Sequence, residues 1–294
     1  MGQDGGRRRL TALHLLILGV IISGIGPVLV RESPVGPAAT AFWRLAIPLP
    51  FAFWYATRSS WFLGMRDVAL ALTSGLLLAA DLVFWNRAIL LTSVMEATVL
   101  VMLFPIIVAA GEIGLFGRKL KPNLLLGGAI AFIGTFILAF GAARGKSSLA
   151  GDLMAMAAAV FFGFSLLISG RLCQRNDPAA VTFWVMVGAA GGALPVALAE
   201  PVTLPKGAYE IVYLAVYGLL TLVAYSLYNS ALAKLPTTLV AISAYGQPVV
   251  ATTLALVLLS EVPSLLSLLG GIVVVAGLFV ATFTPGAVAG ATER

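Results

Sequence analysis

Long apolar blocks alternate with short polar or Gly/Pro-rich breaks along almost the whole chain. A helix rises about 1.5 Å per residue, so roughly 20 apolar residues are needed to cross about 30 Å of hydrocarbon. The blocks reach this length and predict ten membrane-spanning helices. Their approximate ranges are 11–31, 37–57, 67–90, 93–116, 122–143, 150–172, 178–199, 207–232, 236–259 and 263–284. We therefore expect an all-α membrane protein whose short connections leave no room for a soluble domain.

The composition agrees with a protein that lies in the lipid bilayer. Of 294 residues, 60% are hydrophobic and 10% are charged, against roughly 25% charged in a soluble domain. The first apolar block is too long for a signal peptide and lacks a small-x-small cleavage pattern, so it predicts an uncleaved span. The single cysteine, Cys173, excludes an intramolecular disulfide, and the single histidine, His14, leaves no His/Cys metal site. We expect no metal and no cofactor.

The distribution of basic residues predicts the orientation in the membrane. The net charge is +6, but the Lys and Arg residues flank the spans and form no patch on a soluble domain, so we expect no nucleic-acid partner. Positive charge near short loops stays on the cytoplasmic side. If the N-terminus is inside, most of the 18 Lys and Arg residues are cytoplasmic, and the outside positions hold only Arg31, Arg144, Lys146 and Lys206. Both termini are therefore predicted to be cytoplasmic.

The chain contains an internal duplication. Residues 37–44 read PAATAFWR and residues 178–185 read PAAVTFWV, 141 residues further on. Other pairs keep a common offset of 143 residues: Asn86 and Asn229, Pro105 and Pro248, Gly127-Gly128 and Gly270-Gly271, and Gly134 and Gly277. We expect two five-helix repeats, residues 1–145 and 146–294. Because five is odd, the second repeat is inverted, and inverted repeats are typical of secondary transporters that alternate a central site between the two sides.

The pattern of two five-helix units resembles the drug/metabolite transporter (DMT) superfamily, and in particular its EamA-type ten-helix exporters. Each unit has FW early in its second helix, a proline inside its fourth and GG-x5-G in its fifth. The run SEVPSLLSLLGGIVVVAGLFV also resembles that family's Glu-then-Gly signature, although the first repeat has Arg118 where the second has Glu261. Within the group, the sequence is most similar to bacterial aromatic amino-acid exporters of the YddG type. The resemblance implies export of aromatic amino acids and related amphipathic metabolites across the bacterial inner membrane.

Two prolines mark the expected central cavity. Pro105 and Pro248 both lie about 18 Å into their spans, near the bilayer centre. A proline there removes a backbone hydrogen bond and leaves a carbonyl that needs a polar neighbour, a water or a substrate. Either the kinks only shape helix packing, or they line a cavity. The matched depth in two inverted copies favours the cavity.

Polar side chains gather around the second of these prolines. Ser243, Tyr245 and Gln247 precede Pro248 at similar depth. The amide of Gln247 has donors and an acceptor that suit both groups of a zwitterion, and lipid offers it nothing. In the first repeat, the corresponding wall is more apolar and supplies Thr98 and Met102.

Two further segments are candidates that also have a packing explanation, which for the first of them is the more usual one. In the sixth span, Phe161, Phe164 and Ser165 recur at helical spacing near the midplane, and an aromatic stripe there either packs against helices or stacks on an aromatic substrate. In the first span, Ser23 and Pro27 belong to the run SGIGP, which permits either a helix break or close packing.

Charged residues within the spans predict a gate or a brace between helices. Arg44 lies about 10 Å below the outer boundary, and Asp81 and Glu96 have a compatible depth. Since an unpaired charge at this depth is costly, we expect an Arg44–Asp81 pair that either braces two spans or exchanges partners as an outer gate. Near the inner boundary, we expect Glu112 to meet Arg118 or Lys119.

These residues favour a transporter over other membrane proteins. An intramembrane enzyme would need a nucleophile with a base, or a metal-ligand cluster, and the sequence contains neither. A channel or a sensor remains an alternative, as does an exporter of other drugs or metabolites. A phosphorylated cargo would need central Lys or Arg, and only Arg44 is deep. We expect an uncharged or zwitterionic small-molecule substrate, the lipid bilayer as surroundings, and function as a monomer.

Overall fold

The structure is a computed structural model that describes residues 2–59, 62–92, 94–142, 148–259 and 263–283. Arg144, Lys146 and Glu261 lie outside the described residues. All regular elements in the described ranges are helices. In chain order they are α1 (Gly2–Ser23), α2 (Gly26–Arg31), α3 (Pro37–Ala46), α4 (Leu49–Thr57), α5 (Met65–Leu91), α6 (Val94–Val101), α7 (Phe104–Gly114), α8 (Pro122–Ala142), α9 (Leu149–Cys173), α10 (Pro178–Leu198), α11 (Ala208–Leu232), α12 (Thr237–Ser243), α13 (Gly246–Leu259) and α14 (Leu265–Phe283).

Eight helical stretches in the described part of the chain are long and apolar enough to cross a membrane. The predicted spans 37–57 and 236–259 are not among the eight. Four of the predicted spans are each divided into two shorter helices: 11–31 into α1 and α2, 37–57 into α3 and α4, 93–116 into α6 and α7, and 236–259 into α12 and α13. The sequence analysis expected kinks at Pro105 and Pro248 and allowed a break in the run SGIGP, but it did not predict the break within 37–57. Hydropathy shows how long and how apolar a block is, but it does not show whether the helix is broken within the block.

The breaks share a local cause. Pro27 and Pro105 lie in the first turn of α2 and α7, and Pro248 is the third residue of α13. A proline lacks the N–H that would continue the helix and clashes with the preceding turn. The backbone closes tighter bonds there: Ile106 N donates to Leu103 O at 3.0 Å, and Gln247 N donates to Ala244 O at 2.9 Å. Each break thus loses some backbone hydrogen bonds and turns carbonyl groups away from the helix axis.

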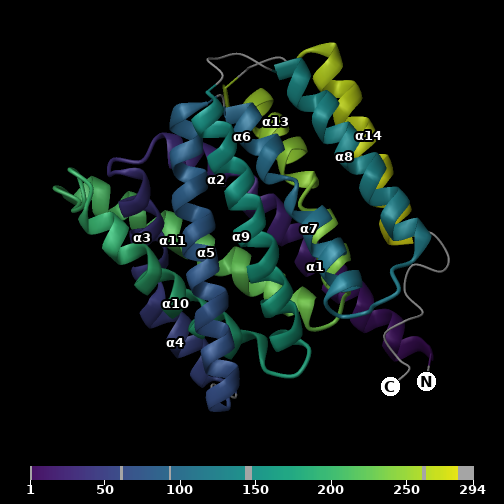
Figure 1. The fold of residues 1–294 in the computed structure, drawn as a ribbon, viewed down its shortest axis with the longest axis horizontal. Coiled ribbons are helices and arrows are strands. Elements are labelled where there is room, and N and C mark those ends of the chain that lie inside the picture. Colours follow the sequence, from purple (N-terminus) through teal and green to yellow (C-terminus); the bar gives the residue numbers. More distant parts are fainter. Residues whose placement is uncertain (1, 60–61, 93, 143–147, 260–262, 284–294) are drawn as a thin grey trace.

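Two ends of the bundle are defined by polar contacts. We call one end the Arg31 end, because α2 ends at Arg31 shortly before α3 begins there. At this end Asn86 Nδ2 donates to Pro37 O at 2.8 Å, and Glu200 accepts from the backbone nitrogens of Ala38 and Ala39. At the other, the Arg175 end, Arg175 pairs with Asp67 and Ser59 bonds to Asp177. Near its start, α1 lies beside the end of α14, where Arg9 Nη2 donates to Thr282 O at 2.8 Å (Figure 1).

The repeated octets are helix entries at opposite ends of the bundle. PAATAFWR opens α3, where the Glu200 carboxylate accepts from Ala39 N at 2.9 Å. PAAVTFWV opens α10, where Asp177 accepts from Ala179 N at 2.8 Å. In both, a proline occupies the first turn, and a carboxylate satisfies free backbone N–H groups and complements the helix dipole.

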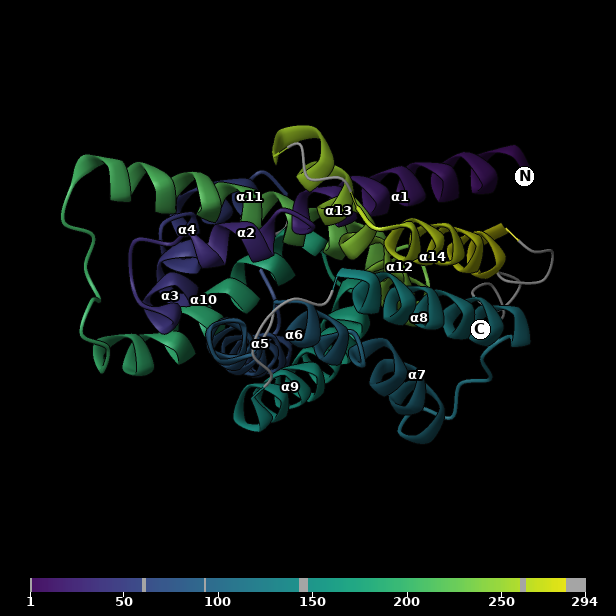
Figure 2. The ribbon, with the colours of Figure 1, turned by 90° about the horizontal axis from the view of Figure 1, so that it is seen from above.

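Helices α8 and α14 form a closely packed pair along one side of the bundle, and they lie side by side in both views (Figures 1 and 2). Their glycines bring the two backbones together. A Cβ on Gly134 would lie 2.5 Å from the backbone nitrogen of Val274, and a Cβ on Gly270 would overlap the backbone nitrogen of Leu138. Small residues allow this approach, which dispersion then stabilises. The glycines that the two halves share in sequence therefore meet in space.

Gly270→Ala is expected to destabilise the protein, because the added methyl group forces α8 and α14 apart. Overpacking of this kind costs about 1–3 kcal/mol. Gly271→Ala is the matched control, since a Cβ there would lie 3.8 Å from the nearest atom. Thermal unfolding in lipid nanodiscs measures the difference. Equal melting temperatures for the two variants would contradict this account of the contact.

Candidate functional site

A cavity of about 900 Å³ lies in the middle of the bundle. Its lining comes from helices of both halves of the chain, and the breaks open onto it. Gly24, Met102 and Ala244, which lie at the α1–α2, α6–α7 and α12–α13 breaks, all line it. The breaks therefore place irregular backbone against a cavity, where it can meet water or a bound solute instead of lipid.

The cavity extends toward the Arg31 end. Its lining includes Arg31, at the end of α2, and Pro263 and Ser264, just before α14. Of the described residues that form the polar contacts at the Arg175 end, none lines the cavity.

Polar groups close the Arg175 end. Asp67 accepts from Asn176 Nδ2 at 2.8 Å, and it forms an ion pair with Arg175. Arg118 lies 3.0 Å from Glu112 Oε2, and the same guanidinium donates to Gln174 Oε1 at 3.0 Å. The predicted contact between Glu112 and Arg118 is confirmed.

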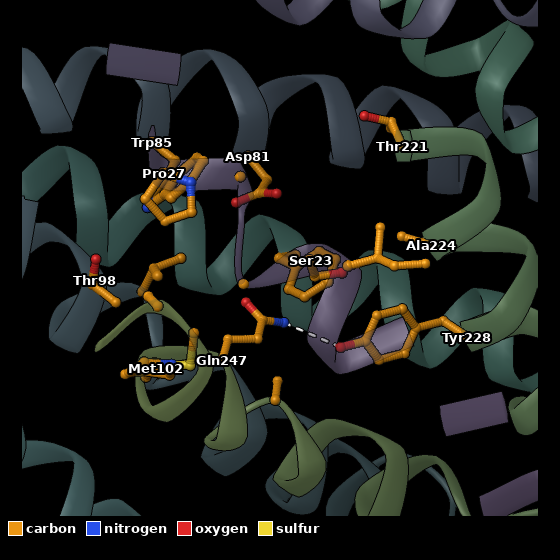
Figure 3. Close-up of a pocket in the computed structure, with 18 of the residues that line it drawn as sticks. Ser23, Pro27, Asp81, Trp85, Thr98, Met102, Thr221, Ala224, Tyr228 and Gln247 are labelled. Carbon is orange, nitrogen blue, oxygen red and sulfur yellow. Dashed lines mark hydrogen bonds between the residues drawn. The ribbon is translucent and has the colours of Figure 1, made fainter. Parts of the chain in front are cut away.

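Gln247 is a polar residue that lines the cavity directly after the α12–α13 break. It lies in the first turn of α13, and its Nε2 donates to the hydroxyl of Tyr228 on α11 at 3.1 Å (Figure 3). This bond uses one of the two amide hydrogens. The Gln247 carbonyl oxygen points into the open space of the pocket (Figure 3), where it can accept a hydrogen bond from a solute.

Asp81 also points into the cavity, from α5 (Figure 3). The residue is 6% exposed. Among the residues that the structure describes, none forms a hydrogen bond or an ion pair with its carboxylate. A carboxylate so placed presents its charge, or its proton, to whatever occupies the cavity.

Arg44 has a partner other than the expected one. Its Nη1 donates to the hydroxyl of Tyr217 on α11, and its guanidinium carbon lies 5.0 Å from the centre of the Tyr217 ring. The Tyr217 hydroxyl in turn donates to the carbonyl oxygen of Gly26 at 3.5 Å. The structure therefore forms no Arg44–Asp81 ion pair, although both residues line the cavity. Depth along a span says nothing about which neighbouring helix a side chain faces, and α3 turns Arg44 toward α11.

Glu96 lies outside the cavity lining. The hydroxyl of Thr92 lies 2.8 Å from Glu96 Oε2 and 2.9 Å from Asp152 Oδ1. This contact joins α6 to the start of α9 at the Arg31 end. Glu96 is therefore not a partner of Arg44 in this structure.

The cavity contains most of the other residues that the sequence analysis selected. The lining includes Ser23, Pro27, Asp81, Thr98, Met102, Ser165, Gln247 and Pro248. It does not include Pro105, Phe161, Phe164, Ser243 or Tyr245.

The residues outside the lining have local packing roles. Tyr245 is 1% exposed and its ring centre lies 5.9 Å from that of Phe132. Ser243 donates to Val240 O within its own helix at 2.7 Å. Phe161 packs against Phe84, with ring centres 5.6 Å apart, and Phe164 is 40% exposed on the outer surface. In α9, Phe162 is the phenylalanine that reaches the cavity.

The sequence analysis missed an aromatic wall on α11. Tyr217, Tyr225 and Tyr228 all line the cavity, and Trp85 of α5 joins them. The three tyrosines are eight and three residues apart, which places them on one face of a helix. This spacing is visible in the sequence and is the signal that predicts a shared face.

Comparison with known proteins identifies the family. A model of the EamA-like transporter family matches residues 10–140 and again residues 149–283. The chain belongs to the EamA-like transporter family. Members of this family are transporters, so the cavity is that of a membrane transport protein that takes a small-molecule substrate.

A solved structure supports the fold of this EamA-like transporter. It is described only as the crystal structure of a protein, and it is 23% identical to this chain with a TM-score of 0.79. The match covers 93% of this chain and 98% of the other. Among curated proteins, none matches the sequence. Within the described residues, no group of three or more His, Cys, Asp or Glu side chains is arranged to hold a metal ion.

Tyr217→Phe is expected to destabilise this EamA-like transporter, because it removes the hydroxyl that Arg44 donates to and leaves a buried charge without that partner. Loss of such a bond costs about 1–3 kcal/mol. Tyr209→Phe is the control, since Tyr209 is 76% exposed. Thermal unfolding in nanodiscs compares them. If Tyr217→Phe unfolds at the wild-type temperature, the Arg44–Tyr217 contact contributes nothing to stability.

Proposed function

We propose that this transporter exports aromatic and other apolar amino acids, and related amphipathic metabolites, by alternating access at the central cavity. The observation that carries the proposal is the cavity itself. Its volume of about 900 Å³ lies within the roughly 300–1,000 Å³ of small-molecule sites. Helix breaks from both halves of the chain border it, so a movement of one half against the other would change which end is open.

The relation between the halves supports this movement. The family model matches the chain twice, once on each side of residues 141–148. The octet entries lie at opposite ends of the bundle, at α3 and α10. These observations support two inverted five-helix repeats, in which two tilts of similar halves would expose one site alternately.

The charge distribution supports an orientation in a bacterial inner membrane. Arg58 precedes Ser59, which bonds to Asp177, and Arg118 bonds to Gln174, so both basic residues lie with Arg175 at the Arg175 end. This end is then the cytoplasmic end by the positive-inside rule. In that orientation both termini are cytoplasmic, and the conformation described here is open to the outside. The ion pairs Glu112–Arg118 and Asp67–Arg175 would close the cytoplasmic end. The transporter would work as a monomer, because the cavity is complete within one chain.

The lining favours an amphipathic cargo. Trp85, Phe162 and Tyr225 offer aromatic surface for packing an apolar ring. The amide of Gln247 and the carboxylate of Asp81 offer a small number of polar contacts. Arg44 is engaged by Tyr217, so a cargo with phosphate groups would lack the cluster of cations that it needs.

Transport by purified protein in proteoliposomes tests the function. We expect saturable uptake of labelled Phe and Trp above the level of empty liposomes, and little uptake of Lys. Lys transport at the rate of Phe would contradict the cargo class, whereas flux of other amphipathic solutes alone would favour an exporter of different drugs or metabolites. If the protein binds aromatic amino acids but transports none of them, it functions as a sensor.

Gln247→Ala tests whether the cavity is the transport site. The substitution removes hydrogen bonds to a charged cargo group, worth about 1.5–3 kcal/mol, so we expect Phe uptake to fall about 10-fold or more. Gln174→Ala is the matched control, because Gln174 lies at the Arg175 end, away from the cavity, where its side-chain oxygen accepts from Arg118. Both proteins should insert into the membrane in equal amounts. Normal uptake by Gln247→Ala would place the site elsewhere.

A further inference from the structure

Asp81 is an acidic residue that no described residue pairs with through an ion pair or a hydrogen bond. Its carboxylate is buried in the middle of the bundle, points into the cavity, and forms no bond with a described residue (Figure 3). Other acidic residues of the described chain are engaged: Glu112 with Arg118, Asp67 with Arg175, and Glu200 with the start of α3. Asp81 is therefore available to a ligand in a way that these residues are not.

The groups around Asp81 do not neutralise it by contact. From α3, Arg44 faces the same cavity but is turned to the Tyr217 hydroxyl. From α11, Tyr217, Tyr225 and Tyr228 face it with neutral hydroxyls. From α2, Arg31 lines the cavity at its open end.

The remaining helices packed against α5 add no counter-charge. On α6 and α9, Glu96 and Asp152 are engaged with Thr92, and Arg171 lies over the ring of Phe116 at the far end. Helix α10 contains no titratable residue. Arg44 is thus the cation that a helix packed against α5 places in the wall of the same cavity, and it forms no ion pair with Asp81.

An ionised carboxylate without a partner is costly in a poorly solvated site, and two species relieve the cost. One is a proton, which makes the group neutral. The other is a cation whose N–H groups donate to the carboxylate. The two species compete, because a bound cation favours the ionised carboxylate, whereas a proton removes the negative charge that attracts the cation.

We propose that Asp81 carries a proton when the cavity is empty and exchanges it for the ammonium group of the cargo, so that export of cargo is coupled to proton uptake. The proposal rests on the proposed export function. When cargo binds, the carboxyl O–H bond breaks, the proton passes to water in the cavity, and cargo N–H groups hydrogen-bond to the carboxylate. When cargo leaves on the other side, Asp81 takes a proton from that side.

The exchange defines the cargo by its cation. An aromatic amine without a carboxylate, such as phenethylamine, retains the group that Asp81 binds. The matching acid without an amine, 3-phenylpropionate, does not. Phe has both groups and binds through its ammonium at Asp81, while its ring packs on the aromatic wall.

Proton release on binding is the direct test. Full-length protein in nanodiscs is mixed with phenethylamine, Phe or 3-phenylpropionate in weakly buffered solution that contains a pH-indicator dye. The wild type is expected to release about one proton per bound phenethylamine or Phe, and to bind 3-phenylpropionate poorly. Asp81→Asn is expected to release none and to bind phenethylamine roughly 10- to 100-fold more weakly.

Asp177→Asn is the matched control for the same chemical change. Asp177 caps α10 at the Arg175 end, and Asn is an equally good cap. This variant is expected to release protons as the wild type does. The melting temperature of Asp81→Asn itself, compared with that of the wild type, shows whether the variant is folded.

The outcomes separate this proposal from the export function. If Phe is transported but binding releases no proton, or if Asp81→Asn binds phenethylamine as the wild type does, the proposal is wrong and export remains. If neither Phe nor Trp is transported, but phenethylamine binds and its binding releases a proton only when Asp81 is present, the cargo assignment is wrong and the cation site remains. If there is neither transport nor Asp81-dependent release, both are wrong.

Discussion

A backbone hydrogen bond that a helix gives up inside a membrane must be replaced, and this requirement governs where the chain breaks its helices. Three breaks, at Gly24, Met102 and Ala244, border the central cavity, where water or cargo can reach the freed carbonyl groups. The fourth, at Pro48, lies against Gly218 of α11, so protein covers it. The helix breaks and the cavity therefore depend on each other. The prolines free carbonyl groups at the cavity wall, and the cavity lets water or cargo hydrogen-bond to them.

Few polar groups enter this cavity, and they come from helices that are distant in sequence. The bond between Arg44 and Tyr217 joins α3 to α11. These helices belong to different halves of the chain, so a movement of the halves would strain or exchange this contact. Asp81 and Gln247 likewise come from different halves, and each presents a group that a solute can use. A cargo that bonds to both would link the halves and bias their relative position.

Much of the architecture could be predicted from sequence because it depends on length, spacing and backbone chemistry. The paired Pro105 and Pro248 both mark breaks, and the shared glycines at 134 and 270 lie where α8 meets α14. What depends on rotation about a helix axis could not be predicted from depth alone. Arg44 bonds to Tyr217 instead of Asp81, Phe162 reaches the cavity instead of Phe161 or Phe164, and Tyr245 points into protein although Gln247 beside it faces the cavity.

The central claim is that one cavity is exposed alternately to the two sides. Cys173 is the only cysteine, so a Cys173→Ser protein that also carries Thr221→Cys has a single thiol in the cavity wall. A membrane-impermeant thiol reagent is added to one face or the other of sealed, uniformly oriented vesicles. The account predicts modification of Thr221→Cys from either face, slowed from both by saturating Phe. Modification from one face only, with or without Phe, would contradict alternating access.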